Sequence, residues 1–316
     1  MTPITVIKSN IKWLLKKLFN LKISLKTPTL ESQISNACAN ILPCLSCIDI
    51  GASYYPHPSW EVFRCSPNTE WIACDPCKEN LNYLQEWRYP CTVFQVPIGL
   101  SQNGGQQTLY VTATDSGSSL LPPEIPNWKQ HRMLMEYFFP LEKKLINTIS
   151  LSELIQQQGL GDNPFLIKLD TQGTELSILQ GLGRETLKQG LIAVEIEVTL
   201  QNEPVMLGSS HFYEVQKFFE DLGFELACLT PIEGILPKFN SELKGRSILN
   251  ECDAVFILRP DIACKKGINY QLSLLGVYIA YKLYGEAIHL IQQLLEQNNL
   301  DSDLELNLKN LSIKLK

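Results

Sequence analysis

The sequence predicts an α/β fold with a mostly parallel sheet, and two observations support this. From residue 47 onward, short apolar runs alternate with segments of helical spacing, which is the pattern of a parallel sheet with helices on its faces. At 316 residues, 45% of them hydrophobic, the chain can also bury one large core. The predicted strands cover residues 47–50, 71–74, 92–96, 166–170, 191–198, 224–229 and 254–258.

Composition divides the chain into a basic segment (1–30), an α/β domain (31–265) and a C-terminal helical appendage (266–316). The appendage contains two apolar helical stretches, 270–283 and 287–295, with a break at a glycine between them. We expect this pair to form a cap on the sheet domain or a contact in a homo-oligomer.

The N-terminal segment predicts a basic amphipathic helix over residues 4–21. Its apolar residues fall on one helical stripe and its lysines recur at intervals of four. The simpler interpretation is a helix packed on the domain with a solvated lysine face; the alternative is a peripheral contact with a membrane surface. The segment is too charged to span a bilayer.

Charge is distributed unevenly along the chain. The formal net charge is −6, yet residues 1–30 hold six lysines and no acidic residue, so the rest of the chain is markedly acidic. Because phosphate binding requires clustered Lys and Arg, a nucleic-acid partner is not expected.

The ten cysteines indicate a reducing, cytoplasmic location, since the N-terminus lacks the pattern of a cleavable signal. Cys44/Cys47 and Cys74/Cys77 have the spacing of zinc ligands. However, Cys47 and Cys74 fall in predicted strands, where a free thiol packs as a small apolar side chain. We therefore expect free thiols and no metal.

The stretch from Phe165 to Leu176 is the most informative motif. An apolar strand ends at Asp170, a turn with Gly173 follows, and a helix begins near Glu175. In parallel α/β sheets, ligands bind at the carboxyl ends of the strands. The motif therefore predicts a ligand site.

A second pair of strand ends predicts the type of ligand. Gly51 follows the first strand and allows a tight turn, while Asp75 ends the next strand, where an acid can accept hydrogen bonds from ribose hydroxyls. The Gly-x-Gly-x-x-Gly and P-loop patterns, which hold pyrophosphate or triphosphate, are absent. These features favour a phosphate-free adenosine cofactor, most commonly S-adenosylmethionine, and disfavour a nicotinamide oxidoreductase.

Several motifs together resemble the FkbM family of S-adenosylmethionine-dependent methyltransferases over roughly residues 45–260. They are Ile48-Asp49-Ile50-Gly51-Ala52, Cys74-Asp75-Pro76, Pro97-Ile98-Gly99-Leu100, Gly117-Ser118-Ser119-Leu120, Ile167-Lys168-Leu169-Asp170-x-x-Gly-x-Glu175 and Val194-Glu195. The resemblance implies a Rossmann-like class I methyltransferase fold. Its seven-stranded sheet would have the order 3-2-1-4-5-7-6, with helices on both faces and the seventh strand antiparallel.

The resemblance also implies a site and a reaction. Cofactor binding would fall to Asp49, Gly51, Ala52, Ser53, Asp75, Pro76, Ile98 and Asp170. The reaction would be O-methylation of a hydroxyl on a small-molecule or carbohydrate acceptor, such as a sugar, glycolipid or secondary metabolite. Ser53 and Gln172 stand where the family more often has Asn and Glu. The alternative function is a non-catalytic module that binds a membrane or protein partner.

An alcohol must lose a proton to accept a methyl group, so a carboxylate or histidine is expected near it. The candidates are Asp170, Glu195, His57 and His211, which all follow or lie in the predicted strands. If the first strand lies beside the fourth, Lys168 pairs with Asp49, either to fix the glycine turn or as a simple buried ion pair. The long connection 99–147, with a strand at 108–111, is expected to form a substrate wall or lid.

Overall fold

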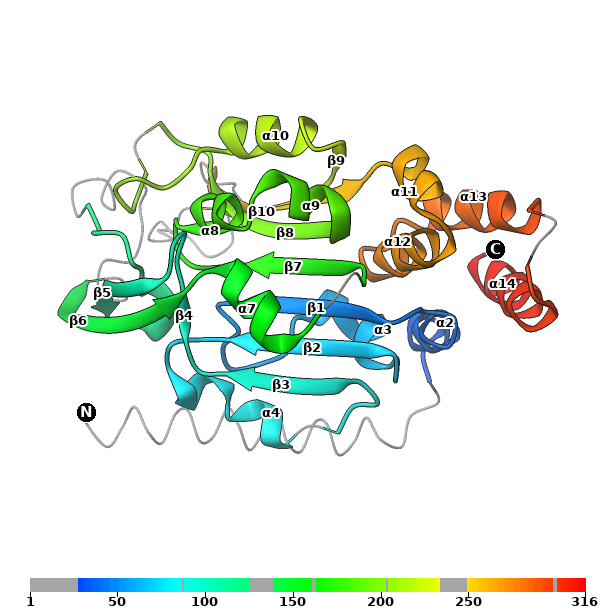
Figure 1. Ribbon diagram of the computed structural model, residues 1–316, viewed down its shortest axis with the longest axis horizontal. Coiled ribbons are helices and arrows are strands. Elements are labelled where there is room, and N and C mark those ends of the chain that lie inside the picture. Colours follow the sequence, from blue (N-terminus) through cyan, green and yellow to red (C-terminus); the bar gives the residue numbers. More distant parts are fainter. Residues whose placement is uncertain are drawn as a thin grey trace, which may run out of the picture.

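The computed structural model describes residues 28–86, 88–124, 139–160, 163–202, 204–233, 249–297 and 300–316. The predicted helix at 4–21 lies outside these residues. In the described part, helices cover both faces of a large sheet, and a small second sheet lies beyond the ends of its parallel strands (Figure 1). This confirms the expected α/β class.

The main sheet has seven strands in the order β3-β2-β1-β7-β8-β10-β9. They are β1 (Leu45–Ile50), β2 (Thr69–Cys74), β3 (Thr92–Val96), β7 (Phe165–Leu169), β8 (Leu191–Thr199), β9 (Phe224–Glu233) and β10 (Leu249–Leu258). Numbered among themselves, these strands read 3-2-1-4-5-7-6. β10 runs antiparallel to both neighbours, so the sheet is mixed, while the other pairs are parallel.

The strand bounds follow from burial on both faces. β1 is buried along its whole length, and β7 and β8 nearly so, which is why they read as continuous apolar runs rather than alternating ones. The sequence underestimates the lengths of β9 and β10, because residues 230–233 and 249–253 are more polar than the rest of these strands. Residues 251–253 of β10 pair with both β9 and β8.

The long connection after β3 builds the second sheet, which the sequence did not predict as a unit. Its strands are β4 (Gly99–Leu100), β5 (Gly105–Thr112) and β6 (Pro140–Ile149), in the order β4-β6-β5. Most of β6 is exposed, so it lacks the apolar pattern by which a buried strand is recognised. β5 contains the one strand predicted here, at 108–111.

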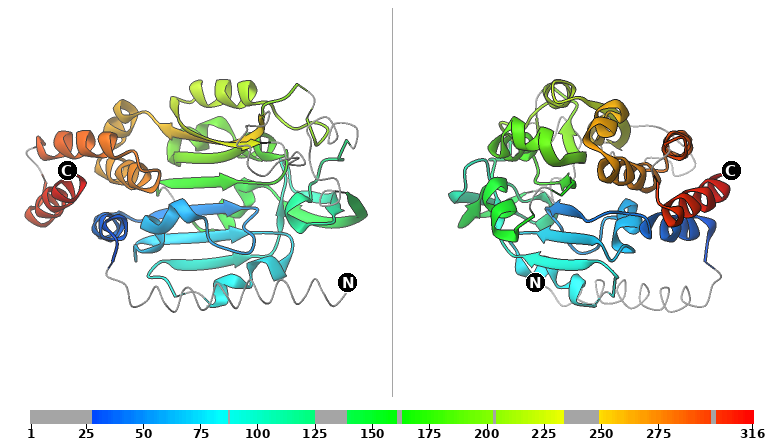
Figure 2. Two further views of the ribbon diagram at one scale, coloured as in Figure 1. Left: turned by 180° about the vertical axis from the view of Figure 1, so that it is seen from behind. Right: turned by 45° about the vertical axis from the view of Figure 1, so that its right-hand side comes forward.

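Helices cover the two faces of the main sheet unevenly (Figures 1 and 2). One face carries α7 (Leu151–Gln158), α8 (Glu175–Leu182), α9 (Arg184–Gly190) and α10 (Phe212–Glu220). The other face carries α2 (Leu30–Ala39), α3 (Glu61–Arg64) and α12 (Ile268–Ala280), which contact one another. The short elements η1 (Pro58–Trp60), η2 (Lys78–Leu81), α4 (Tyr83–Glu86) and η3 (Asp115–Gly117) lie in the connections after β1, β2 and β5.

The C-terminal part contains more helices than predicted. α11 (Pro260–Lys266) leads into α12, and α13 (Tyr284–Leu295) and α14 (Ser302–Leu315) follow. α12 contacts β8 and β10, and α14 returns to α2. The buried side chains of these helices join the same apolar core as the sheet. The predicted pair, α12 and α13, therefore packs as a cap together with two further helices, α11 and α14. Of the helices in the described residues, none has the length and apolar character needed to cross a membrane.

Candidate active site

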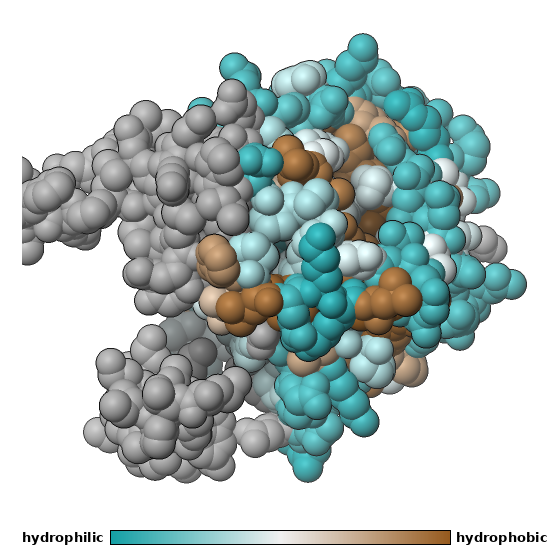
Figure 3. Space-filling view, turned by 90° about the vertical axis from the view of Figure 1, so that its left-hand side faces the viewer, coloured by the Kyte–Doolittle hydropathy of each residue, from teal (hydrophilic) through white to brown (hydrophobic). Residues whose placement is uncertain are grey.

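One cavity of about 440 Å³ opens where the parallel strands end. Figure 3 shows this end of the molecule, where apolar side chains (brown) lie among hydrophilic ones (teal) on the described surface. Ile50 is in register with both Cys74 and Leu169, so the residues that follow β1, β2 and β7 meet at one edge of the sheet. Residues from all three strand ends line the cavity; they include Gly51, Ser53, Asp75, Pro76, Ile98 and Asp170.

The turn after β1 depends on a glycine. Gly51 adopts φ +80, and a Cβ at this position would lie 2.0 Å from the Asp170 carbonyl oxygen. The Gly51 and Ala52 N–H groups both donate to the Cys74 carbonyl, at 2.9 and 3.0 Å, and the Asp170 N–H donates to the Ile50 carbonyl at 3.1 Å. The three strand ends are therefore locked together through backbone contacts that only glycine allows.

Asp75 is held in a fixed orientation at the cavity. It is only 7% exposed, and its Oδ1 accepts hydrogen bonds from the Cys77 N–H at 2.7 Å and from Asn80 Nδ2 at 3.1 Å. Pro76 and Ile98 line the cavity beside it. A carboxylate next to apolar surface suits a ligand that presents hydroxyls beside a flat apolar ring.

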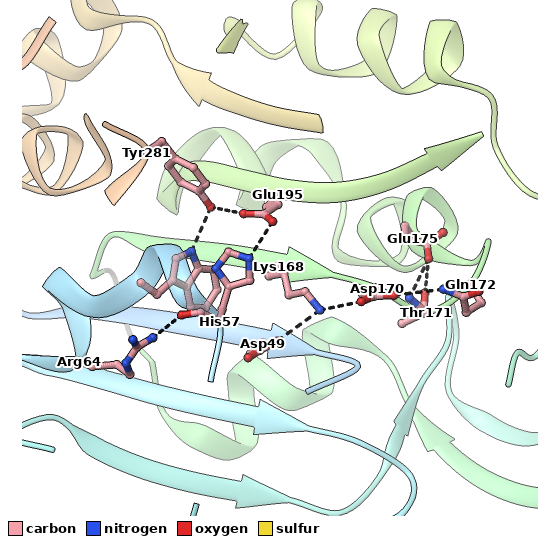
Figure 4. Close-up of polar contacts among 11 residues, drawn as sticks. Asp49, His57, Arg64, Lys168, Asp170, Thr171, Gln172, Glu175, Glu195 and Tyr281 are labelled. Carbon is pink, nitrogen blue, oxygen red and sulfur yellow. Dashed lines mark hydrogen bonds and ion pairs between the residues drawn. The ribbon is translucent and has the colours of Figure 1, made fainter. Parts of the chain in front are cut away.

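Charged residues from three neighbouring strands form a row across the sheet (Figure 4). Asp49, Lys168 and Glu195 are in register across β1, β7 and β8. Lys168 Nζ lies 3.0 Å from Asp170 Oδ2 and 3.9 Å from Asp49 Oδ1, so the predicted Lys168–Asp49 pair is confirmed. Burial alone would lower the pKa of Lys168, but Asp170 and Asp49 outweigh burial and raise it. The lysine therefore stays charged and fixes Asp170 at the cavity.

The turn after β7 is organised by Glu175, which is the first residue of α8, where the sequence predicts the helix to begin. The Glu175 side chain is 3% exposed, and its Oε1 accepts from the Thr171 and Gly173 N–H groups at 2.8 and 2.9 Å. Gln172 adopts φ 58, and its Nε2 donates to Asp170 Oδ1 at 3.2 Å and to Glu197 Oε2 at 2.7 Å. A glutamine amide can donate to two carboxylates, which a glutamate at this position cannot do.

Only some of the predicted site residues line the cavity. Gly51, Ser53, Asp75, Pro76, Ile98 and Asp170 do. Ala52 is buried in the core, and Asp49 lies in the charged row across the sheet. His57 Nε2 bonds Glu195 Oε1 at 2.8 Å, and His211 precedes α10 with its ring stacked on Tyr213. None of these last three candidates is among the lining residues.

Sequence reasoning missed the outer wall of the cavity. Leu109 and Val111 of β5 and Lys144 and Ile146 of β6 line it opposite the strand ends; we call these four residues the β5–β6 wall. The two residues on each strand are two positions apart, so their side chains lie on the same face of the sheet. The expected role of 99–147 as a wall fits this position, but neither strand pattern identified the residues.

The cysteines do not form the zinc site that their spacing allowed. Cys47 and Cys74 are buried inside β1 and β2, and burial raises the pKa of both thiols, which disfavours the thiolate that zinc requires. No group of three or more metal-ligating side chains of the His, Cys, Asp or Glu type occurs among the described residues.

Carboxylates crowd the β8–β10 pair beside the cavity, where Glu197 and Asp253 are in register. Burial, with negative charges nearby, raises the pKa of Glu251 to about 7 and that of Asp253 to about 6. Both pKa values exceed those of the same carboxyl groups in an unfolded chain, so between about pH 4 and 7 the folded protein binds protons that the unfolded chain has released. Its stability therefore falls as pH rises from about 4 to 7.

Replacing Glu251 with Gln removes one of these groups. We expect the free energy of unfolding to rise by about 1–2 kcal/mol at pH 8, a value reduced for partial exposure, and to change little at pH 5. Urea unfolding at both pH values measures this. Glu185→Gln, at an exposed helix position, is expected to have no effect at either pH. A loss of stability in Glu251→Gln at pH 8 would contradict the account.

Comparison with known families identifies the chain. Residues 49–226, more than half of the chain, match the methyltransferase FkbM domain. The chain belongs to the FkbM methyltransferase family. The expected enzyme class, an S-adenosylmethionine-dependent methyltransferase, is thereby confirmed. No curated protein matches the sequence.

Solved structures with some similarity include a SAM-dependent methyltransferase from Anabaena variabilis (12% identity, covering 78% of this chain and 84% of that one, TM-score 0.32). A precorrin-6y C5,15-methyltransferase from Geobacter metallireducens has 13% identity, covers 72% of this chain and 87% of its own, and gives a TM-score of 0.29.

Proposed function

We propose that the chain transfers a methyl group from S-adenosylmethionine to a hydroxyl of a sugar, glycolipid or secondary metabolite. The observation that carries this proposal is that Asp75 and Asp170 line one cavity together with the Gly51 turn. The first carboxylate, after β2, suits ribose hydroxyls. The second follows β7, on the other side of β1, where the reacting groups would meet.

The chemistry of the lining residues fits this cofactor. The charged residues are three carboxylates, Asp75, Glu79 and Asp170, and two lysines, Lys78 and Lys144; no arginine is among the lining residues. A net negative cavity attracts a sulfonium cation and disfavours pyrophosphate. The Gly51 turn brings backbone close to the ligand without a side chain in the way.

When bound, S-adenosylmethionine would supply an activated methyl carbon that an oxygen nucleophile can attack in line, with S-adenosylhomocysteine as the leaving group. The protein mainly has to hold the two reactants in place. We assign Asp170 to the acceptor: its carboxylate would orient the acceptor hydroxyl and accept its proton. Its side chain is 40% exposed, while Lys168 and Gln172 fix its position.

The acceptor would lie between Asp170 and the β5–β6 wall. Leu109, Val111 and Ile146 offer apolar contacts, and Ser118 and Ser119 also line the cavity. This mixture suits a molecule with both hydroxyls and apolar surface.

The direct test is methyl transfer from S-adenosylmethionine carrying a labelled methyl group to a panel of glycosides, glycolipids and hydroxylated secondary metabolites. We expect label in a base-stable methyl ether, with S-adenosylhomocysteine formed in equal amount. Label in a base-labile ester or on nitrogen would refute O-methylation of a hydroxyl. Cofactor binding with no transfer to any member of the panel would refute the acceptor class.

A further inference from the structure

A chain of hydrogen bonds joins the C-terminal helices to the loop after β1 (Figure 4). Trp60 Nε1 donates to the Tyr281 hydroxyl at 3.0 Å, and this hydroxyl donates to Glu195 Oε2 at 2.6 Å. The other oxygen of Glu195 bonds His57 Nε2 at 2.8 Å. Tyr281 is the C-cap residue of α12, so the chain connects that helix, strand β8 and the loop.

Glu195 depends on both partners. The side chains of His57 and Glu195 are each 10% exposed, and a buried carboxylate is costly unless its oxygens are bonded. Burial alone would raise the pKa of Glu195, but the bonds from His57 and Tyr281 outweigh burial and lower it. Burial and the adjacent Glu195 charge raise the pKa of Tyr281, so its hydroxyl keeps its proton and remains a donor.

The loop from Gly51 to His57 needs such support. Tyr54 adopts φ 64, a left-handed conformation that costs a residue with a side chain about 1 kcal/mol or more. The loop start is fixed at Gly51 by the strand ends. Its end is fixed at His57, where Glu195 holds the ring and the Arg64 guanidinium donates to the backbone carbonyl. Ser53, between these two points, lines the cavity.

We propose that Tyr281 and Glu195 are positioning residues that hold the Gly51–His57 loop in the shape that binds the cofactor. The C-terminal helices would then support the cofactor site through Tyr281, rather than form a separate module. This inference rests on the proposed function, because the loop matters only if the cavity binds the cofactor.

The test compares two hydroxyl deletions on the same helix. Tyr281→Phe removes the bond to Glu195 and the bond from Trp60 Nε1, and keeps the ring. Tyr270→Phe removes a bond from α12 to the Gln189 carbonyl, 2.6 Å away, without touching Glu195. Calorimetry with S-adenosylhomocysteine and amide hydrogen exchange of residues 51–60 are measured on the full chain for both variants.

For Tyr281→Phe we expect binding about 10-fold weaker and exchange of the Tyr54 and Trp60 amides faster by about 10-fold or more, with a melting temperature that shows a folded protein. Tyr270→Phe should match the wild type in both readouts. Equal behaviour of the two variants would overturn the proposal. If the wild type itself does not bind S-adenosylhomocysteine, the proposed function is refuted. If the wild type binds and Tyr281→Phe leaves both binding and loop exchange unchanged, only the positioning role is refuted.

Discussion

Replacing Asp170 with Asn is expected to lower kcat by about 100-fold or more. The change keeps the size of the side chain and its place at the cavity, but an amide cannot accept a proton from the acceptor hydroxyl. A 100-fold loss corresponds to about 2.7 kcal/mol of transition-state stabilisation. Steady-state kinetics with an acceptor found in the labelled-methyl assay measures it.

Two further measurements distinguish the loss of a catalytic base from the loss of the folded structure. Lys168 loses its nearest partner in this variant, so thermal unfolding must show that the protein still folds. Asp221→Asn removes a carboxylate that pairs with Arg184 on the surface and is expected to keep wild-type kcat. If Asp170→Asn keeps kcat within about threefold of wild type, Asp170 is not the base.

Replacing Gly51 with Ala is expected to lower the free energy of unfolding by about 3 kcal/mol or more. A left-handed conformation costs alanine about 1–2 kcal/mol. The new methyl group would also lie 2.0 Å from the Asp170 carbonyl oxygen, so the ends of β1 and β7 must separate. Urea unfolding measures the loss, and cofactor binding is expected to be lost with it.

The matched variant is Gly159→Ala. Gly159 also has a positive φ, at 63, but nothing lies within 4 Å of a Cβ built there. The free energy of unfolding of this variant should therefore fall only by the conformational cost of about 1–2 kcal/mol. Equal losses in the two variants would show that the contact between β1 and β7 is not tight.

Much of the fold could be predicted because the parallel strands are buried on both faces. The stretch around Lys168 and Asp170 stood out since charges at the end of an apolar strand are rare without a function. Strand alternation also predicted that Lys168 would meet Asp49, once β1 and β7 were neighbours.

Other features could not be read from the sequence. His57 and Glu195 are 138 positions apart, and no local pattern indicates that they pair. Tyr281 lies at the end of a helix whose aromatic residues predict only packing. β6 is mostly exposed, so its part in the cavity wall follows from its tertiary position rather than from its own residues.

The central claim is that the cavity over the Gly51 turn binds an adenosyl group through Asp75. Calorimetry of the wild type and of Asp75→Ala with S-adenosylhomocysteine tests it most directly. We expect the wild type to bind and the variant to have an affinity at least about 30-fold lower, since the ligand would lose charge-assisted bonds from two hydroxyls to the buried carboxylate. Equal affinity of the two proteins, or no binding by the wild type at millimolar ligand, would contradict it.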